Sequence, residues 1–289
     1  MDSPTVGILG LGGLGLPVAA NIAKSMPVIG YDPKQPAGET VHDARTVATV
    51  DEVAAGASTI LLCLPSPKVS AAVVTALAAL PADQPRLIVE LSTIGIETAE
   101  ACAAIAAEAG VGYLDAPVSG LVAKAWAGTL TVMAAGRAEY LATAQPILEL
   151  ISSHIFALGD RPGLGQAMKL ANNIINATSF AITSEAIVFG TRAGLDLAQM
   201  LDILNVSTGM TSASLEKFPQ GVLNRTAVPG APGEIIAKDV ALFLAEAAQV
   251  GTPVAVSTVV GQLWAEYVSR HPNTDSIELY GYLNGGINK

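Results

Sequence analysis

Aromatic residues, cysteines and positive charges are all scarce in this sequence. Phe, Trp and Tyr together make up 4% of the residues although 51% are hydrophobic, and alanine and glycine are abundant. This composition favours helices packed closely on a sheet over an aromatic-lined β-sandwich. The formal net charge of -10 opposes binding to nucleic acid or to an anionic membrane surface, so we expect a small-molecule partner.

The few cysteines and histidines give no sign of a metal or disulfide site. Cys63 and Cys102 lie in apolar segments without CxxC spacing, which predicts reduced, buried and structural thiols. His42, His154 and His271 lack the spacing of metal ligands. The sequence therefore predicts no bound metal.

Long membrane-spanning runs are also missing from the sequence. The apolar stretch from Val6 to Ala20 follows Asp2 instead of a basic segment and is dense in glycine, unlike a signal peptide. No uninterrupted apolar run approaches the roughly 20 residues that cross a bilayer. We therefore expect a cytoplasmic protein without a membrane segment.

The first half of the chain alternates short β-branched runs with Ala-rich segments of helical length, which predicts βαβ units and a mostly parallel sheet. The predicted strands are Thr5–Gly10, Val28–Asp32, Thr59–Leu64, Leu87–Leu91, Tyr113–Ala116, Thr129–Ala134 and His154–Leu158. The last two flank a predicted helix over Ala138–Ile151 and are expected to extend the same sheet.

The second half of the chain has a helical pattern. Gln166–Arg192 contains no proline, and further helices are expected to about Arg270. A first helix of about 28 residues would span roughly 40 Å, which suits a helix shared by both domains or by a dimer interface. We predict an α/β domain over residues 1–162 and an all-α domain over residues 163–289. The clearest loop is Val228–Gly233.

A glycine-rich segment follows the first predicted strand and precedes a helix towards Lys24. It reads Gly10, Leu11, Gly12, Gly13, Leu14 and Gly15, which fits G-x-G-x-x-G. The first glycine allows a tight turn, the second lets a pyrophosphate approach the backbone, and the third lets helix and strand pack closely. This context predicts a Rossmann-type, doubly wound dinucleotide-binding domain.

Asp32 ends the next strand, seventeen residues after Gly15, where this fold places a carboxylate on the adenosine ribose. A carboxylate repels a 2′-phosphate and no arginine follows it, which favours NAD over NADP. Lys34 nearby leaves NADP open as the less favoured cofactor. The alternative for Asp32 is a turn residue at a strand end.

Three segments together carry a family resemblance. They are GLGGLGLPVAANI from Gly10, DAPVSG from Asp115 to Gly120, and GLGQAMKLANN from Gly163 to Asn173. In this order and spacing the chain resembles the β-hydroxyacid dehydrogenase family, which includes 3-hydroxyisobutyrate dehydrogenase and tartronate semialdehyde reductase. The resemblance covers essentially the whole chain. It implies NAD-dependent oxidation of the 3-hydroxyl of a small 3-hydroxy carboxylic acid to a semialdehyde or 3-oxo acid, or the reverse reduction.

The DAPVSG segment follows a predicted strand and offers the Ser119 hydroxyl with the N–H groups of Ser119 and Gly120. Such a polar cluster suits a carboxylate, and the resemblance implies that these two residues bind the substrate. A simple Ser-Gly turn is the alternative.

Lys169 and Asn173 are four residues apart, so they share one face of the long helix. Removing hydride from an alcohol also requires removing the hydroxyl proton, and a partly desolvated lysine has a lowered pKa that suits this task. The resemblance assigns acid/base catalysis to Lys169 and hydrogen bonding to the substrate to Asn173. The alternative for Lys169 is a solvated helix lysine.

Further candidates rest mainly on the resemblance. The pair Lys238-Asp239, expected to open a helix, implies an electrostatic role for Lys238 beside cofactor and substrate, whereas helix capping by Asp239 explains the pair as well. Leu64 ends one predicted strand and Pro65 follows it, while Thr93 follows another. Open α/β sheets place ligands at these strand ends, so all three residues are expected to line the cofactor site.

The sequence departs from the family pattern next to DAPVSG. Leu121 stands where many relatives have a second glycine. Lys124 occupies a position that is usually small, and Trp126 occupies one that is usually acidic or polar. Leu121 would narrow the substrate pocket, while Trp126 either caps the pocket or packs against a helix. Ala231–Glu234 also lacks the aromatic residue that commonly precedes the Lys-Asp pair.

Two other functions are open at this point. One is an NADPH-dependent imine reductase on the related fold, against which Lys169 and Asp32 argue. The other is a non-catalytic dinucleotide-binding scaffold or sensor, against which Lys169, Asn173 and Ser119 argue. The long helix is compatible with a dimer or a tetramer, and the resemblance implies a homodimer or homotetramer, because the family forms oligomers through such helices.

Overall fold

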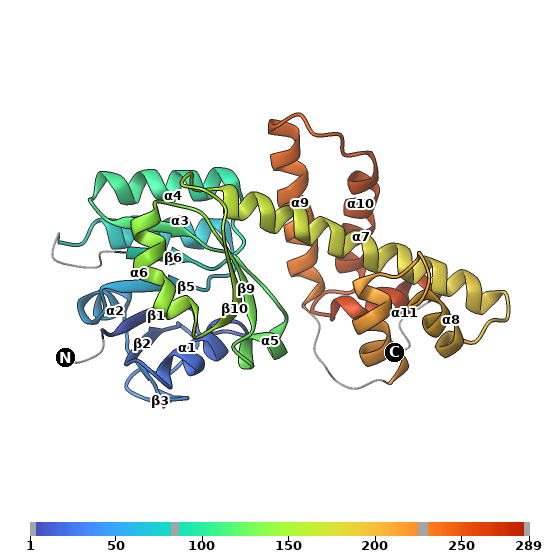
Figure 1. Ribbon diagram of the computed structural model, residues 1–289, viewed down its shortest axis with the longest axis horizontal. Helices are drawn as coiled ribbons and strands as arrows, with labels where there is room; N and C mark the ends of the chain where they lie inside the picture. The colour runs from blue at the N-terminus through green and yellow to red at the C-terminus, as the bar shows by residue number, and fades with distance from the viewer. Residues whose placement is uncertain (1–3, 82–86, 225–230, 286–289) are drawn as a thin grey trace. The chain divides into compact units, whose positions relative to one another are not determined.

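The computed structural model describes residues 4–81, 87–224 and 231–285. The chain divides into two compact units, residues 1–169 and residues 170–289. Figure 1 shows the first unit as an α/β structure in blue and green and the second as helices in yellow to red. The predicted boundary between residues 162 and 163 lies in the turn before the long helix and stays a prediction.

The first unit contains a seven-stranded sheet with the order β3-β4-β2-β1-β5-β6-β7. Its strands are β1 (Val6–Leu9), β2 (Val28–Tyr31), β3 (Thr40–Val41), β4 (Ala44–Thr46), β5 (Thr59–Leu62), β6 (Leu87–Glu90) and β7 (Gly112–Asp115). All neighbouring strands are parallel except β3 and β4. The predicted Rossmann-type sheet is confirmed, and its strand order reverses direction beside β1.

Helices cover both faces of this sheet (Figure 1). They are α1 (Gly15–Ala23), α2 (Val50–Gly56), α3 (Pro67–Ala78), α4 (Ile96–Glu108), α5 (Val122–Trp126) and α6 (Ala138–Leu148). One face packs against α1 and α6, and the other packs against α2, α3 and α4. All four residues of β5 are buried. Strands buried on both faces of a sheet are mostly apolar, which is why the sequence predicted them.

The antiparallel hairpin of β3 and β4 was not predicted. His42 and Asp43 form its turn with φ angles of 47° and 65°, in the left-handed region. Turns of this kind are usually recognised in a sequence by an Asn-Gly or Asp-Gly pair. His-Asp gives no such signal, and strands of two and three residues are too short for a periodic pattern.

A second, three-stranded sheet corrects one prediction. Its strands are β8 (Val118–Ser119), β9 (Leu130–Ala134) and β10 (Ser152–Ala157), in the order β10-β9-β8. The prediction that the last two runs extend the main sheet is therefore wrong. The chain leaves β7 at Pro117, which has no N–H group, and β8 then offers the edge with which β9 pairs. Only an isolated bridge from Asp115 to Ala135 is formed between the two sheets in the described part of the chain.

The long predicted helix is confirmed as α7 (Leu164–Arg192), 29 residues that begin in the first unit and continue into the second. The second unit adds α8 (Leu197–Leu204), a π-helix η1 (Ala213–Leu223), α9 (Gly233–Gln249), α10 (Ala255–Arg270), a 3-10 turn η2 (Ser276–Glu278) and α11 (Leu279–Leu283). Of the loop predicted over residues 228–233, residues 228–230 lie outside the described residues, and α9 already begins at Gly233.

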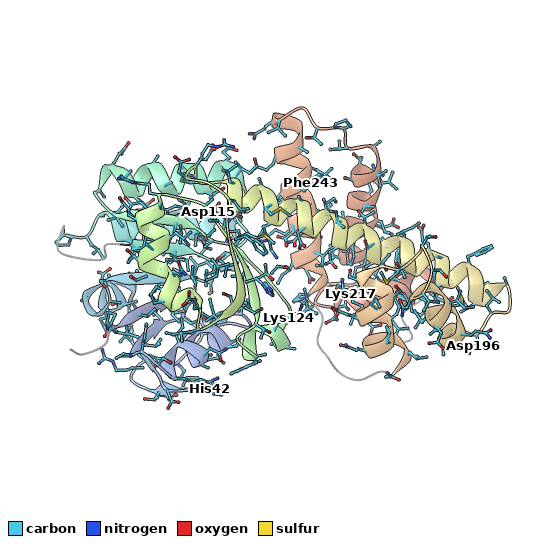
Figure 2. The ribbon with its side chains drawn as sticks, in the orientation of Figure 1. His42, Asp115, Lys124, Asp196, Lys217 and Phe243 are labelled. Atoms are coloured by element: carbon cyan, nitrogen blue, oxygen red, sulfur yellow. The ribbon has the colours of Figure 1, made fainter. Side chains whose placement is uncertain are left out.

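Aromatic side chains form the core of the second unit. Phe180, Phe218, Trp264 and Tyr267 are each at most 1% exposed and contact one another. Lys217 Nζ lies 4.9 Å from the centre of the Phe180 ring, and burial lowers the pKa of Lys217 to about 8 (Figure 2). The few aromatic residues of the chain thus supply much of this core.

Helix α7 has the length and the mean hydropathy, 1.2 over its most apolar window, of a helix that crosses a membrane. Half of that window is buried inside the protein. The core helix of a soluble protein has the same properties, so this result is weak evidence for a membrane span.

A buried carboxyl group lies at the end of β6. Glu90 is 0% exposed and pairs in register with Asp115 on β7. One of its oxygens accepts a hydrogen bond of 2.9 Å from the Ser92 N–H. Burial raises the pKa of Glu90 from 4.5 to about 7, so the folded protein binds this proton more tightly than the unfolded chain does. Its contribution to stability is therefore complete below about pH 4.5 and is lost as the pH rises through about 7.

We expect Glu90→Gln to stabilise the protein at alkaline pH, because the neutral amide avoids burying a charge. The shift in pKa corresponds to about 3 kcal/mol in the free energy of unfolding. Urea unfolding at pH 9 should show this gain, and unfolding at pH 4 should show none. Glu108→Gln, at an exposed position on α4, is the control. Equal gains at both pH values would contradict the expectation.

Candidate functional site

The glycine-rich loop joins β1 to α1 at the carboxyl end of the main sheet. Gly10 adopts a φ of 95°, and its N–H donates to Tyr31 O at 2.8 Å. A Cβ atom on Gly15 would overlap the Gly10 carbonyl oxygen, so the helix can start here only with glycine. Among the described residues, no atom lies within 4 Å of a Cβ built on Gly12 or Gly13. The loop is closed on its inner side and open on its outer side, which fits an approaching pyrophosphate.

Asp32 follows β2 and is fixed against this loop. Its Oδ2 atom accepts a hydrogen bond of 2.8 Å from the Leu11 N–H, and its Oδ1 atom accepts one of 2.8 Å from the Lys34 N–H. Each carboxylate oxygen can accept a further hydrogen bond. The loop and this carboxylate together have the form that a dinucleotide requires, with capacity left for ribose hydroxyls.

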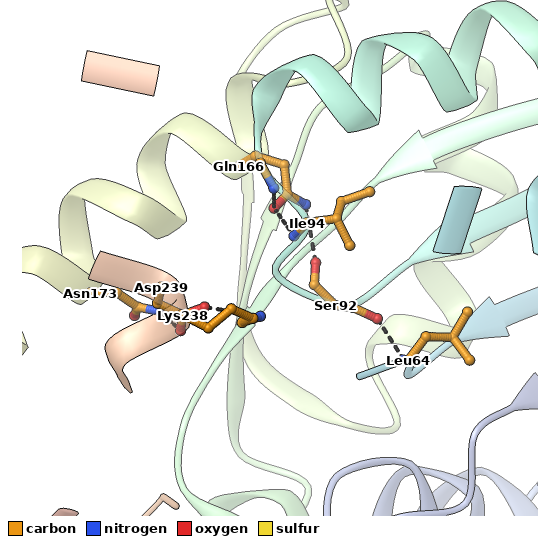
Figure 3. Close-up of polar contacts among 8 residues, drawn as sticks. Leu64, Ser92, Ile94, Gln166, Asn173, Lys238 and Asp239 are labelled. Carbon is orange, nitrogen blue, oxygen red and sulfur yellow. Dashed lines mark hydrogen bonds and ion pairs between the residues drawn. The ribbon is translucent and has the colours of Figure 1, made fainter. Parts of the chain in front are cut away.

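Ser92 connects the ends of β5 and β6, and no sequence pattern identified it as a site residue. Its hydroxyl accepts a hydrogen bond of 2.7 Å from the Leu64 N–H and donates one of 3.3 Å to Leu62 O. Figure 3 shows the contact between Ser92 and Leu64. This hydroxyl therefore holds the loops that carry Pro65 and Thr93, two of the predicted cofactor residues.

Gln166, in the first turn of α7, was also missed. Its side chain is 0% exposed and hydrogen-bonds to Ile94 in the loop after β6 (Figure 3). It also hydrogen-bonds to Asp115. Asp115 accepts from Gln166 Nε2 at 2.7 Å, and from the N–H groups of Gly163 and Gln166 at 2.9 and 3.1 Å. Burial raises the pKa of Asp115 to about 6, although these hydrogen bonds oppose the rise. The start of α7 is thereby fixed to the carboxyl ends of β6 and β7.

Ser119 and Gly120 follow Asp115 at the end of β8. Gly120 has a φ of 143°, and a Cβ atom there would lie 2.7 Å from Leu130 Cδ2 and 3.1 Å from Lys124 Cβ. The positive φ and these short contacts both favour glycine at this position. This arrangement is compatible with the predicted carboxylate site.

The residues that depart from the family pattern lie at and on α5. Leu121 is 37% exposed and Trp126 is 41% exposed. The Trp126 ring contacts His42 edge to face, with 5.0 Å between ring centres. The Trp126 and Ala125 carbonyls accept hydrogen bonds from Asn21 Nδ2 on α1 at 3.3 and 2.7 Å. Within this unit Trp126 is therefore a packing residue between α5 and the β3–β4 turn.

Lys169 is the last residue of the first unit and lies three residues after Gln166 on α7. One helical turn separates it from the residue that the buried hydrogen bonds fix. The predicted residues of the first unit are therefore held by one connected set of loops and the first turns of α7.

The second unit contains its own group of predicted residues. Asp239 is 4% exposed, and its Oδ2 accepts a hydrogen bond of 2.6 Å from Asn173 Nδ2 (Figure 3). Its Oδ1 forms an ion pair of 3.1 Å with Lys238 Nζ. Helix α9 begins at Gly233, so the alternative that Asp239 caps a helix is wrong. Asp239 instead holds both Asn173 and Lys238, a role that the sequence did not reveal.

The described residues contain no group of three or more His, Cys, Asp or Glu side chains that could hold a metal ion. Cys102 is buried, Cys63 is partly buried, and both are free thiols. Burial raises the pKa of both thiols, which disfavours the reactive thiolate. The polar side chains described above are therefore the groups of this site that are available for binding and proton transfer.

Two family models match the chain. Residues 5–159 match the NAD binding domain of 6-phosphogluconate dehydrogenase. Residues 163–283 match a family described as NAD-binding of NADP-dependent 3-hydroxyisobutyrate dehydrogenase. The two matches follow each other along the chain and divide it near the start of α7.

Individual relatives agree with these matches. A 3-hydroxyisobutyrate dehydrogenase from Pseudomonas aeruginosa is 34% identical over 284 residues, which cover 94% of this chain and 93% of that protein. A 2-(hydroxymethyl)glutarate dehydrogenase from Eubacterium barkeri is 29% identical, covering 90% of this chain and 87% of that protein. The structure of a Mycobacterium tuberculosis 3-hydroxyisobutyrate dehydrogenase with L-serine aligns with a TM-score of 0.87 at 28% identity, covering 98% of this chain and 100% of that chain.

Proposed function

Because this chain belongs to the 3-hydroxyisobutyrate dehydrogenase family of NAD(P)-dependent 3-hydroxyacid dehydrogenases, we propose that it uses NAD to oxidise the 3-hydroxyl of a small 3-hydroxy acid. The product is a semialdehyde or a 3-oxo acid, and the reverse reduction uses the same groups. One observation carries the proposal: Gln166 joins the start of α7, which contains Lys169, to the loop that carries Thr93 and to Asp115, which precedes Ser119. Membership in this family of enzymes favours a dehydrogenase over an imine reductase or a scaffold.

The geometry of the first unit supports the proposed cofactor residues. Since the Gly10 and Leu11 N–H groups already donate to Tyr31 O and Asp32 Oδ2, we assign the pyrophosphate to the open side of the loop over residues 10–15, at Gly12 and Gly13. Asp32 accepts hydrogen bonds from the adenosine ribose, while Leu64, Pro65 and Thr93 line the nicotinamide side. When bound, NAD supplies the hydride acceptor, and the protein supplies the remaining groups.

In this mechanism Lys169 holds and moves the proton. As its neutral amine, Lys169 Nζ accepts the substrate hydroxyl proton while the carbon loses hydride and the carbonyl forms. The resulting ammonium returns the proton to the alkoxide in the reduction. General acid–base catalysis of this kind contributes roughly 10²–10⁴-fold to a rate.

Binding of the substrate carboxylate falls to Ser119 and Gly120, with Asn173 and Lys238 as further donors. Support comes from the required glycine at position 120 and from Asp239, which orients the Asn173 amide. A short 3-hydroxy acid satisfies these groups, because its carboxylate and its hydroxyl lie only two carbons apart. Leu121 beside this segment favours a compact acid.

Lys169→Ala should lower kcat by at least about 10²-fold and leave NAD affinity unchanged, because only the proton acceptor is lost. The measurement is NAD reduction with L-serine, 3-hydroxyisobutyrate, 3-hydroxypropionate and glycerate at mildly alkaline pH, together with NAD titration by fluorescence. Lys24→Ala, at the exposed end of α1, is the control. Undiminished turnover by the Lys169 variant would remove this residue from the mechanism.

We expect the wild type to prefer NAD over NADP by at least about 10-fold in kcat/KM, because the Asp32 carboxylate repels a 2′-phosphate. Two like charges about 4 Å apart near a protein surface repel by about 4 kcal/mol. Asp32→Ala should reduce the preference by about 10- to 100-fold, whereas Asp51→Ala on α2 should not change it. A wild-type preference for NADP would overturn this assignment of Asp32.

We also propose that α7 pairs with a second copy of this chain. Ile175, Ile182 and Phe189 lie seven residues apart on α7 and are 65%, 55% and 75% exposed. Apolar residues at heptad spacing form one stripe, the pattern by which helices pair, and a two-fold axis makes the stripe complementary to itself. From residue 170 to residue 192, Glu185 and Arg192 are the charged residues. Two copies of this segment therefore meet without net repulsion.

Ile182→Glu should shift the protein towards the monomer, because it places two like charges near the centre of the stripe. Sedimentation velocity measures the change directly, with an oligomer expected for the wild type. Val256→Glu tests whether any exposed apolar residue has this effect, since Val256 on α10 is 66% exposed. A monomeric wild type, or equal dissociation by both variants, would contradict the proposed pairing.

A further inference from the structure

The carboxamide of Gln166 uses all of its hydrogen-bonding capacity inside the first unit. Its Oε1 atom accepts from the Ile94 and Gly95 N–H groups at 2.9 and 3.3 Å. Its Nε2 atom donates to Ser92 O at 3.1 Å and to Asp115 Oδ1 at 2.7 Å. A primary amide has two donors and a two-fold acceptor, so every position is filled. A fully buried side chain bonded in this way has one orientation.

These bonds reach two segments that are distant from Gln166 in the sequence. Ser92, Ile94 and Gly95 surround Thr93 in the loop after β6. Asp115 begins the segment that leads to Ser119, and its second oxygen accepts the N–H groups of Gly163 and Gln166 at the start of α7. These are N–H groups that a helix leaves without partners in its own backbone. One carboxamide and one carboxylate therefore fix the first turn of α7 in both position and direction.

Lys169 is three residues after Gln166, so its backbone belongs to the next turn of the same helix. Residues three apart are neighbours on a helix surface. A rotation or shift of the first turn therefore displaces the Lys169 amine relative to Thr93 and Ser119. A misplacement of about 1 Å can lower a rate by about 10²-fold.

We propose that Gln166 is a positioning residue for proton transfer, which holds Lys169 in place relative to the loops that carry Thr93 and Ser119. This inference rests on the proposed role of Lys169. Gln166 does not contact the reacting atoms, since its carboxamide is fully hydrogen-bonded, and it acts by fixing the position of α7.

The decisive variant is Gln166→Glu, because its effect depends on protonation. When the introduced carboxyl is protonated, it has the shape of the amide, accepts from Ile94 and donates to Asp115. When it is ionised, two carboxylates face each other across the 2.7 Å contact and repel. Burial and the Asp115 charge both raise the pKa of the introduced carboxyl. Asp115, Glu90 and the buried Tyr113 are titratable groups in this region.

We expect the ratio of the variant kcat to the wild-type kcat to fall as the pH rises, from within about 10-fold near pH 6 to a loss of about 10²-fold near pH 9. NAD affinity should change by less than about 3-fold. The solvent deuterium isotope effect on kcat should increase, because a misplaced lysine makes proton transfer slower. Gln166→Met, which fills the space without hydrogen bonds, should lower kcat at all pH values and should also increase the isotope effect.

A control separates positioning from general destabilisation. Asn21 is a buried amide on α1 that donates to Ala125 O at 2.7 Å, and Asn21→Asp also buries a carboxyl in the first unit. It should lower the melting temperature and leave the isotope effect unchanged. A folded Gln166→Glu variant with a pH profile parallel to wild type and an unchanged isotope effect would overturn the positioning role.

Failure of this inference differs from failure of the proposed function. If Lys169→Ala is inactive and Gln166→Glu behaves like the wild type, Lys169 keeps its role and Gln166 loses its positioning role. If Lys169→Ala retains turnover, the acid/base assignment fails, and the positioning role fails with it. Circular dichroism on each variant confirms that the protein measured is folded.

Discussion

The buried hydrogen bond between Gln166 and Asp115 is the interaction on which the rest of the first unit's site depends. Asp115 forms no ion pair among the residues that the structure describes, so N–H donors alone stabilise its charge. Removing one donor from a buried charged group costs about 1–3 kcal/mol or more. The donors lie at Gly163, just before α7, and at Gln166 in its first turn, while the acceptor ends β7. The hydrogen bonds that stabilise the carboxylate therefore also align the start of the helix with the sheet.

Polar side chains at the carboxyl edge of the sheet order the loops, while apolar strands provide the framework. Ser92 joins the ends of β5 and β6, and Asp32 joins the loop after β1 to the end of β2. Parallel strands bring their carboxyl ends to one edge, so short polar residues there can reach several loops. Each contact is modest alone, yet together they hold these loops at one edge of the sheet.

The fold was largely readable from the sequence, whereas the residues that organise the site were not. Buried parallel strands need continuous apolar runs, and the glycine loop has a fixed spacing, so both leave local signals. Sheet membership leaves no such signal, which is why β9 and β10 were assigned to the wrong sheet. Gln166 and Asp115 are 51 residues apart in the sequence, and Asn173 and Asp239 are 66 apart. A buried polar residue gains its role from a distant partner that no local pattern identifies.

The two units use buried carboxylates in different ways, which bears on how an acid is recognised. Asp239 is paired with Lys238 at 3.1 Å, so these two side chains together carry no net charge. A paired lysine attracts an anion less than an unpaired one does, because the field of the carboxylate partly cancels its own. The proposed substrate carboxylate therefore depends more on hydrogen bonds from Ser119, Gly120 and Asn173 than on the charge of Lys238. Directed hydrogen bonds fix the position of the carboxylate more strongly than a point charge does. They thereby also fix the position of the substrate hydroxyl.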